Sequence, residues 1–331
     1  MLRFGTIGSG WICDEYIHGA KDSGLWELTA VYSRTKERAE EYARRHGAKY
    51  AFTNLEEMAA SDCIDAVYIS SPNALHYEHS KAFLERGKHV ICEKPLCAQA
   101  SKVRELQRIA QEHGAVFLEA IMYLHLPQRK LLEDTLQQLG QISLVKLDFC
   151  QRSSKLDRYL QGELPNIFNP ALETGALMDL GVYCVYPALA LFGKPESFSL
   201  QPHMMESRAD GAGVATLRYP DKLVTLTYSK LGQAGANSDF QGTEGTLSVE
   251  SISRLAGFSL WRKDGTKEAL YRDDEKYKLM GWEAKDFFRY ITEPDASAAE
   301  YARCSELALQ VSELMEAMRK QAGILFASDR R

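Results

Sequence analysis

Long hydrophobic runs are missing from this sequence. Its longest apolar stretch, Gly181 to Phe192, falls short of the ~18–20 residues that cross a bilayer, and Pro187 interrupts it. The N-terminus passes from Met1-Leu2-Arg3 into a glycine cluster without the apolar segment that a secretory signal requires. We therefore expect no membrane segment and a cytoplasmic location.

An excess of charge of one sign and paired cysteines are missing as well. The 40 Lys and Arg residues against 45 Asp and Glu leave a net charge of −5, so no broad positive field would attract a nucleic acid. The seven cysteines are odd in number and form no Cys-x-x-Cys pair, which argues against a disulfide framework or a zinc site. We expect reduced thiols and no nucleic-acid partner.

What the chain does contain is enough residues for two domains. Its 331 residues exceed the ~100–200 of a typical domain. Up to about residue 120, short β-rich runs alternate with helical patterns, which is typical of βαβ units and of a parallel sheet with helices on both faces. The expected elements are strands at Leu2–Gly8, Leu28–Ser33, Ala66–Ser70, His89–Cys92 and Val116–Glu119, and helices at Lys36–His46 and Leu75–Arg86.

The pattern changes in the second half. From Val145 to Phe149 hydrophobic and polar residues alternate, which indicates an antiparallel sheet with one open face. The fold class predicted is therefore α/β: a doubly wound parallel sheet in residues 1–120, and an α+β domain with a large, mainly antiparallel open sheet in residues 121–331. A last helix over about residues 305–321 is a candidate to pack back on the first domain.

A glycine-rich turn, Gly8-Ser9-Gly10-Trp11-Ile12-Cys13, follows the first expected strand and precedes a helical pattern. Two glycines permit a tight turn and let the backbone approach a pyrophosphate at the helix N-terminus. The third position of the motif is Cys13, which is still small. A purely structural turn is the alternative, but the placement between strand and helix favours a dinucleotide-binding Rossmann domain.

The second expected strand ends in Ser33-Arg34, where NAD enzymes usually carry an acidic residue. An arginine can pair with the 2′-phosphate that distinguishes NADP(H), whereas an acidic residue would repel it. We therefore expect NADP(H) as the preferred cofactor, with NAD(H) possible. The alternative is that Arg34 is only a solvated loop cation.

Two further features carry possible chemistry. Glu93-Lys94-Pro95 follows the strand His89–Cys92 at the sheet edge that faces the ligand crevice, where a lysine can stabilise a developing alkoxide. Asp179 and Tyr183 are four residues apart, which places them on one face of a helix. Taken alone, Lys94 would be a surface residue, Tyr183 a core aromatic and Asp179 a helix-terminal charge.

Together these motifs resemble a known family. The stretches GTIGSGWI from Gly5, YISSPNALHYEHSKAFLERGKHVICEKPL from Tyr68, EAIMY from Glu119 and GALMDLGVY from Gly175 are similar to the glucose–fructose oxidoreductase/inositol dehydrogenase (Gfo/Idh/MocA) family. The nearest branch is that of the dihydrodiol dehydrogenases and NADP-dependent sugar dehydrogenases, which carry Tyr where inositol dehydrogenases carry His.

The resemblance implies an NAD(P)-dependent dehydrogenase that acts on CH–OH groups of a sugar, polyol or trans-diol. Tyr183 would exchange the hydroxyl proton, Lys94 would favour its ionised form, and Asp179 would fix the geometry. The residues implied in cofactor binding are Gly8, Ser9, Gly10, Trp11, Ile12, Ser33, Arg34, Ser71, Pro72, Asn73, His76, Glu93, Lys94, Pro95 and Glu119. Arg152, Tyr159 and Asn166 are candidates for substrate binding, with solvated loop positions as the alternative.

The chain departs from the family pattern at two places. Leu124 stands where the family often has Arg, and Glu173-Thr174-Gly175 replaces a glycine run before the catalytic helix. No metal is expected, because His76 and His79 have no third ligand at a helpful spacing.

Other readings of function and assembly stay open. The chain could be a non-catalytic dinucleotide sensor, or a glycosidase that uses a bound cofactor for transient oxidation. A sheet with one open face often associates, so a homodimer or higher homo-oligomer through the second domain is expected.

Overall fold

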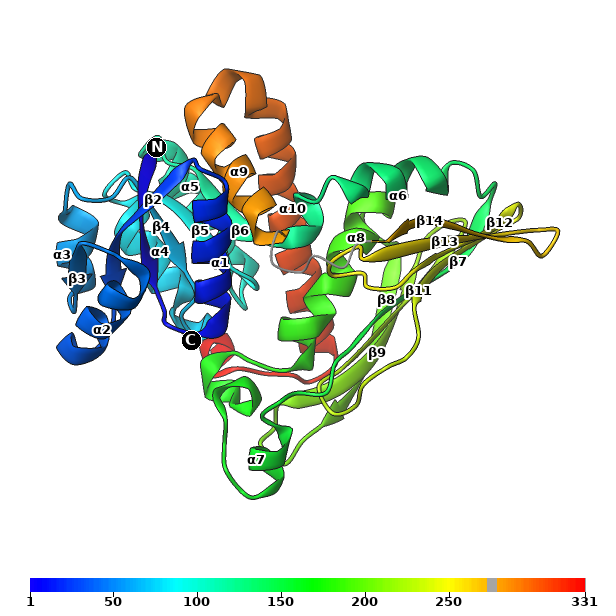
Figure 1. The fold of residues 1–331 in the computed structure, drawn as a ribbon. Coiled ribbons are helices and arrows are strands. Elements are labelled where there is room, and N and C mark those ends of the chain that lie inside the picture. The colour runs from blue at the N-terminus through cyan, green and yellow to red at the C-terminus, as the bar shows by residue number, and fades with distance from the viewer. Residues whose placement is uncertain (273–278, 331) are drawn as a thin grey trace. The chain divides into compact units, whose positions relative to one another are not determined.

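The computed structural model describes residues 1–272 and 279–330 (Figure 1). Their contacts group them into two compact units. The first comprises Met1–Met122 and Glu275–Leu309, and the second Tyr123–Asp274 and Gln310–Arg331, counting in each only the described residues. Within those residues no helix is long and apolar enough to cross a membrane.

The first unit is built on a six-stranded sheet in the order β3-β2-β1-β4-β5-β6, and all its neighbouring strands run parallel. The strands are β1 (Leu2–Ile7), β2 (Trp26–Tyr32), β3 (Tyr50–Phe52), β4 (Ala66–Ile69), β5 (His89–Glu93) and β6 (Phe117–Ala120). The strand order reverses direction between β1 and β4, which is where ligands bind in open sheets of this kind. The predicted parallel sheet is confirmed, and the sequence pattern missed only its short edge strand β3.

Helices pack on both faces of this sheet (Figure 1). They are α1 (Trp11–Asp22), α2 (Lys36–His46), α3 (Leu55–Ala60), α4 (His76–Leu84), α5 (Ala100–Glu112), α9 (Leu279–Thr292) and the first part of α10 (Pro294–Gln321). Helix α2 has the predicted bounds and ends at Gly47, whose φ of 74° is the left-handed conformation that glycine supplies at a helix end.

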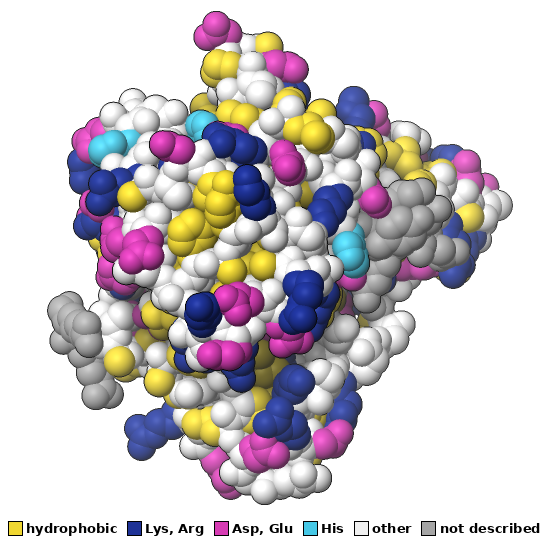
Figure 2. All heavy atoms as spheres, turned by 60° about the vertical axis from the view of Figure 1, so that its left-hand side comes forward, with side chains coloured by type: hydrophobic (Ala, Val, Ile, Leu, Met, Phe, Trp, Pro, Cys, Tyr) yellow, Lys and Arg dark blue, Asp and Glu magenta, His cyan; other side chains and the backbone are white. Residues whose placement is uncertain are grey.

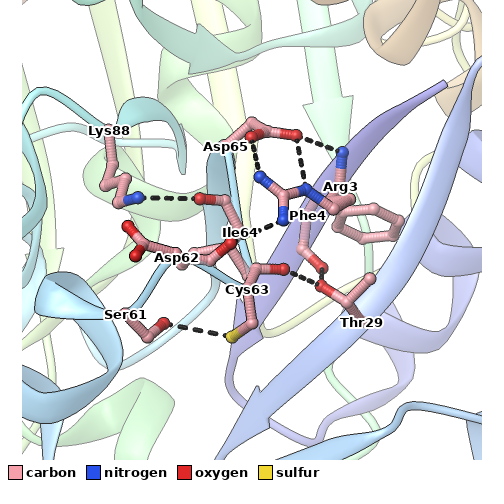
Figure 3. Close-up of polar contacts among 9 residues, drawn as sticks. All are labelled: Arg3, Phe4, Thr29, Ser61, Asp62, Cys63, Ile64, Asp65 and Lys88. Atoms are coloured by element: carbon pink, nitrogen blue, oxygen red, sulfur yellow. Dashed lines mark hydrogen bonds and ion pairs between the residues drawn. The ribbon is translucent and has the colours of Figure 1, made fainter.

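The amino edge of the sheet is fixed by a polar network around Arg3 and Asp65 (Figure 3). The guanidinium of Arg3 donates to both carboxylate oxygens of Asp65, at 3.1 and 2.5 Å, and the backbone N–H of Arg3 adds a third bond at 2.8 Å. Thr29 donates to the carbonyl of Cys63 at 2.6 Å. Burial pushes the pKa of Asp65 upward, but the bonds and charge of Arg3 outweigh it and hold that pKa below its ordinary value.

Helices from the end of the chain complete the first unit. Trp26 of β2 stacks on Phe287 of α9 with ring centroids 5.3 Å apart. The hydroxyl of Tyr301 in α10 accepts from the N–H of Phe117 at 2.9 Å and donates to its carbonyl at 3.2 Å. Tyr301 thereby covers backbone groups of β6, which is an edge strand. The predicted last helix begins earlier than expected, at Pro294.

The second unit contains an eight-stranded sheet in the order β14-β13-β12-β11-β7-β10-β9-β8. Its strands are β7 (Ile142–Cys150), β8 (Ser197–Met204), β9 (Asp210–Arg218), β10 (Leu223–Ser229), β11 (Ser238–Gly242), β12 (Gly245–Val249), β13 (Gly257–Arg262) and β14 (Lys267–Arg272). Every neighbouring pair is antiparallel except β7 and β10. The predicted, mainly antiparallel sheet is confirmed.

Helix α8 (Val182–Phe192) of the second unit packs on β7 and β10 of this sheet. The unit contains further helical segments, namely α6 (Gln128–Leu136), α7 (Leu156–Leu160) and the last part of α10. Beyond α10 the chain is held by Arg319, whose fully buried guanidinium pairs with Asp329 and donates to the carbonyl of Ile324 at 2.8 Å.

Positively and negatively charged side chains are intermixed on the face shown in Figure 2. Lys and Arg lie among Asp and Glu over the coloured part of that face, in keeping with a net charge of only −5.

Candidate active site

The turn between β1 and α1 contains two glycines that the fold needs for different reasons. At Gly8, φ is 122°, and a Cβ would lie 2.3 Å from the Ser70 hydroxyl and 3.0 Å from the Ser70 carbonyl oxygen. The tight turn against β4 therefore requires glycine. Gly10 has an ordinary φ of −87°, and a Cβ there would meet no atom of the chain within 4 Å.

Because the protein's own packing leaves the space at Gly10 open, this position fits close approach by an external group. Gly10 is the N-cap of α1, so the first amides of that helix face the same exposed turn. Ser9 and Trp11 on either side are exposed too, and Ile12 is half-buried. Amide N–H groups with an open approach suit a pyrophosphate, and the residues present fit a dinucleotide.

The end of β2 carries the cations expected for a 2′-phosphate. The N–H of Ser33 donates to the carbonyl of Phe52 at 3.1 Å, and the exposed Arg34 precedes Thr35, the N-cap of α2. Lys36 and Arg38, in the first turn of α2, are also exposed. The sequence reasoning did not select these two, although they stand two and four residues beyond Arg34.

The loop after β4 is tied to the Glu-Lys-Pro motif by His76. Its ring is 1% exposed, with Nδ1 2.9 Å from the Pro95 carbonyl oxygen and Nε2 2.7 Å from that of Ser71. Carbonyl oxygens only accept, so both contacts are hydrogen bonds at once only when both ring nitrogens carry protons. His76 therefore joins two segments predicted to line the cofactor. Pro72 and Asn73, which follow Ser71 in the same loop, are half-buried.

His79 does not complete a metal site with His76. Burial, with His76 adding to the effect, lowers the pKa of His79 to about 4, and its Nδ1 lies 3.0 Å from the Ser71 hydroxyl. Among the described residues, no group of three or more His, Cys, Asp or Glu side chains could hold a metal ion.

Lys94 directly follows β5 at the carboxyl edge of the sheet and is half-buried. Buried carboxylates form hydrogen bonds on either side of it, one between side chains and one to a backbone N–H. Glu93 accepts from the Tyr68 hydroxyl at 2.6 Å, and Glu119 accepts from the N–H of Leu96 at 3.3 Å. The two glutamates that the resemblance assigns to cofactor binding thus hold the segment that presents Lys94.

A third buried carboxyl near this segment was missed by the sequence reasoning. Glu283 of α9 is 1% exposed, and burial, with the charge of Glu93 adding to it, raises the pKa of Glu283 well above its ordinary value. Burial and the neighbouring carboxylate therefore both favour its neutral form. In sequence, Glu283 is one acidic residue of an amphipathic helix and carries no sign of burial.

In the second unit, Asp179 lies in a π-helical turn. The sequence predicts a regular helix from Asp179 to Tyr183, but Leu177–Gly181 is a wider turn and α8 begins only at Val182. A Cβ at Gly181 would lie 2.9 Å from the Leu177 side chain and 3.1 Å from the ring of Tyr228, so glycine lets this turn pack directly on β10. Single π-turns within helices are frequent at functional sites.

The side chains of the predicted pair are both partly accessible. The Asp179 carboxylate is 36% exposed, and Tyr183 is half-buried with its ring packed edge-on against Phe149, at a centroid distance of 5.1 Å. A carboxylate and a phenol at the head of one helix can hydrogen-bond a hydroxylated ligand.

The main surprise in the second unit is Lys230, which directly follows β10. Its side chain is 2% exposed, with Nζ 2.7 Å from Oδ2 of Asp179 and 3.3 Å from the carbonyl oxygen of Ile167. The ring of Phe168 lies 5.7 Å from the same nitrogen. In sequence, Lys230 looks like a solvated cation at a strand end, and no local pattern signals its burial.

A second aspartate helps to hold the π-turn. Asp210 is fully buried, and its Oδ2 accepts from the N–H of Leu177 at 2.6 Å. Burial raises the pKa of Asp210 to about 6, although backbone hydrogen bonds and the charge of Lys230 act against this rise. A Cβ at Gly175 would lie 1.9 Å from Oδ1 of Asp210, so glycine is required there.

The two departures from the family pattern have structural consequences. Glu173 adopts a left-handed conformation, with φ 57° and ψ 42°, at a position where the family usually has glycine. A side chain in this conformation costs about 1 kcal/mol relative to glycine. Leu124 is 4% exposed, so the position where the family often has Arg belongs to the core here.

The candidates for substrate binding lie between β7 and the π-turn. Arg152 is exposed and pairs with Asp157 at 2.6 Å. The hydroxyl of Tyr159 accepts from the N–H of Ser207 at 3.0 Å. Asn166 is exposed, and its carbonyl accepts from Thr174. Each of the three is engaged with the protein, and their role toward a substrate stays a prediction.

A parallel sheet with a glycine turn at its switch point, followed by a large open sheet, defines the class of two-domain, nicotinamide-dependent oxidoreductases. The family models agree. Residues 2–120 match an oxidoreductase family with an NAD-binding Rossmann fold, and residues 129–248 match the GFO/IDH/MocA C-terminal domain. The chain belongs to the Gfo/Idh/MocA family of oxidoreductases, as its motifs suggested.

Two of its relatives are named as dehydrogenases. The chain is 40% identical to the scyllo-inositol 2-dehydrogenase (NADP(+)) IolU of Bacillus subtilis, over 99% of both chains. It is 25% identical to the trans-1,2-dihydrobenzene-1,2-diol dehydrogenase of Danio rerio, again over 99% of both. The fold matches KijD10, a 3-ketoreductase from Actinomadura kijaniata solved with NADP, with a TM-score of 0.85 at 24% identity over 97% of both chains.

Proposed function

We propose that this protein is an NADP(H)-dependent dehydrogenase that moves a hydride between nicotinamide and a secondary alcohol carbon of a cyclic polyol, sugar or trans-diol. The observation that carries the proposal is the placement of Asp179 and Tyr183 at the head of one helix, with the carboxylate held by a buried cation. The polyol and diol activities named for two relatives support this substrate class.

Several residues of the first unit would hold the cofactor. Gly8 and Gly10 allow the pyrophosphate to approach the amides of α1, and Arg34, together with Lys36 and Arg38, supplies positive charge for a 2′-phosphate. When bound, the nicotinamide accepts or donates the hydride. The NADP(+) in the name of one relative supports the same preference.

The proposed chemistry of the chain's own residues is acid–base catalysis. Tyr183 takes the hydroxyl proton of the substrate as the hydride leaves the same carbon, and returns it in the reverse direction. Lys94 supplies positive charge that stabilises the developing alkoxide. Asp179 accepts a hydrogen bond from the substrate and fixes its orientation.

The substitution Tyr183→Phe tests the assignment of the base. Loss of the phenolic hydroxyl should lower kcat by about 10²–10⁴-fold, as expected for a lost general acid–base, while the Kd for NADPH stays unchanged. Tyr186→Phe, a fully buried tyrosine of the same helix, is the matched control and should keep activity within a few fold. A Tyr183→Phe enzyme with the kcat of the wild type would overturn the assignment.

A substrate panel of inositols, sugars and trans-diols, followed by NADPH absorbance, tests the function itself. Turnover with net oxidation or reduction of NADP(H) is expected. Tight NADPH binding with no turnover across the panel would favour a dinucleotide sensor. Bond cleavage in glycosides without net change in NADP(H) would favour the glycosidase.

We also propose a cytoplasmic homodimer or higher homo-oligomer associated through the second sheet. None of the seven cysteines, all of which are described, forms a disulfide, which suits a reducing compartment. Val214, Leu223 and Trp261, from three strands of that sheet, are 44–51% exposed. Sedimentation analysis of the purified protein would reveal a monomer if this proposal is wrong.

A further inference from the structure

We infer that Lys230 is a positioning residue that orients the Asp179 carboxylate for the substrate, an inference that rests on the function proposed above. The juxtaposition is specific: a buried ammonium on one sheet strand faces a carboxylate on a π-turn. The family resemblance assigned roles to Asp179 and Tyr183 but none to Lys230.

Burial of Lys230 needs an explanation, because an ammonium removed from water is costly unless it is paired and hydrogen-bonded. Its Nζ meets both requirements, with the Asp179 carboxylate at 2.7 Å and the Ile167 carbonyl oxygen at 3.3 Å. Asp210, whose pKa responds to the charge of Lys230, contributes further negative potential. The cation therefore lies in an environment built from two aspartates and a carbonyl.

The backbone of Lys230 is fixed as firmly as its side chain. Its N–H donates to the carbonyl of Gly211 at 2.8 Å, and its own carbonyl accepts from the N–H of Ser153 at 2.9 Å. These bonds join it to the start of β9 and to the segment after β7. The ammonium is consequently held by a rigid sheet. A flexible loop, in contrast, could move together with Asp179 and would not fix its position.

This arrangement has a chemical consequence for Asp179. The Lys230 ammonium engages Oδ2 of Asp179, and the oxygens of a carboxylate only accept hydrogen bonds. An acceptor selects ligands that present a donor, such as the hydroxyl groups of a polyol or diol. Because Lys230 contacts Oδ2, it also sets the plane of the carboxylate, which would rotate about its own side-chain bonds without this contact.

A purely structural ion pair is the competing explanation, and a double-mutant cycle separates the two. The variants are Lys230→Met, Asp179→Asn and the double substitution, each assayed for kcat/KM and for the urea midpoint of unfolding. If Lys230 acts through Asp179, Lys230→Met lowers kcat/KM by about 10- to 100-fold, as a misplaced catalytic group does. The double variant then falls no more than a few fold below Asp179→Asn.

The remaining variants control for charge and for folding. Lys222→Met, at the other end of β10, removes a lysine that is 15% exposed and paired with the neighbouring Asp221, and should leave kcat/KM unchanged. Lys230→Arg keeps the charge and should recover part of the activity. If Lys230→Met does not fold, the double variant, which also removes the Asp179 charge that Lys230 pairs with, should still fold, and Lys230→Arg carries the comparison.

Two results would overturn the inference. One is a folded Lys230→Met enzyme with wild-type kcat/KM, or with an effect that simply multiplies that of Asp179→Asn. The other is a double variant that unfolds at no higher urea than Lys230→Met, which would deny the pairing itself. The urea midpoint can be measured without turnover. A wild-type protein that is inactive on every substrate of the panel described above would therefore count against the proposed function and leave the pairing of Lys230 with Asp179 testable.

Discussion

The two glycines of the β1–α1 turn allow the cofactor-binding role to be separated from folding. Alanine at Gly8 should destabilise the protein, because φ is 122° there and a Cβ would lie 3.0 Å from a backbone oxygen of Ser70. Backbone strain of this kind costs about 1–3 kcal/mol. Alanine at Gly10 should be nearly neutral, within about 1 kcal/mol, because its φ is ordinary and the lost N-cap glycine is offset by lower chain entropy in the unfolded state.

For cofactor binding, we expect the clearer effect at Gly10, the position where alanine hardly changes stability. A methyl group at Gly10 fills space that the chain itself leaves open, so it would interfere only with a ligand. Loss of one hydrogen bond from an amide to a charged phosphate costs about 1.5–3 kcal/mol, which weakens NADPH binding by roughly 10- to 150-fold. Fluorescence titration with NADPH measures the Kd, and urea unfolding measures the stability of both variants.

The combination of results decides the matter. A Gly10→Ala protein that is stable but binds NADPH poorly would support the turn as a pyrophosphate site. If Gly10→Ala binds NADPH as tightly as the wild type, our reasoning about this turn is refuted, whatever the effect at Gly8.

Two other substitutions have calculable outcomes. Arg34→Ala should raise the KM for NADP(H) by at least about tenfold and leave that for NAD(H) nearly unchanged, because a charge-assisted bond to the 2′-phosphate is lost; equal effects on both cofactors would contradict this role. Arg319→Met should lower the free energy of unfolding by about 3–5 kcal/mol, since it leaves the Asp329 carboxylate, 5% exposed, without its partner. Burial raises the pKa of Asp329, but the hydrogen bonds of Arg319 outweigh it and keep that pKa below its ordinary value. The stabilisation by this ion pair is therefore complete above the pKa of Asp329 in the unfolded state, and it is lost as the pH falls through the pKa of Asp329 in the folded state. Acid unfolding followed as a function of pH should show this loss in the wild type and not in Arg319→Met.

Much of the first unit could be predicted from sequence because its signals are local. Near-continuous hydrophobic strands and a glycine after the helix Lys36–His46 depend only on neighbouring residues, and that helix has the predicted bounds. Strand β3 is only three residues long, and two of them are exposed, so it is too short for a hydrophobic period to stand out. Helix α9 was missed because its role, packing on α1 and β2, depends on residues far away in the chain.

The residues of the candidate site that belong to a sequence motif could be predicted. Those placed there by long-range packing could not. Lys94 stands in a motif, and Asp179 and Tyr183 share a helical spacing. Lys230 has neither, because its burial is created by a strand end that meets a helix from another part of the sequence. The π-turn at Leu177–Gly181 also has no characteristic hydrophobic periodicity in the sequence. Only Gly181, a glycine inside an apolar run, indicates close packing there.

The composition of the first unit has a consequence for how the chain is made. Phe287 and Tyr301 complete the packing of β2 and β6, yet they are synthesised long after these strands. At a ribosomal rate of ~5–20 residues per second, the interval between residue 122 and residue 309 lasts roughly 10–40 s. During this time Trp26 lacks its contact with Phe287, and the backbone groups of the edge strand β6 lack their hydrogen bonds to Tyr301. Residues 1–122 alone are thus an unfinished dinucleotide-binding domain, whose folding ends with the part of the chain made last.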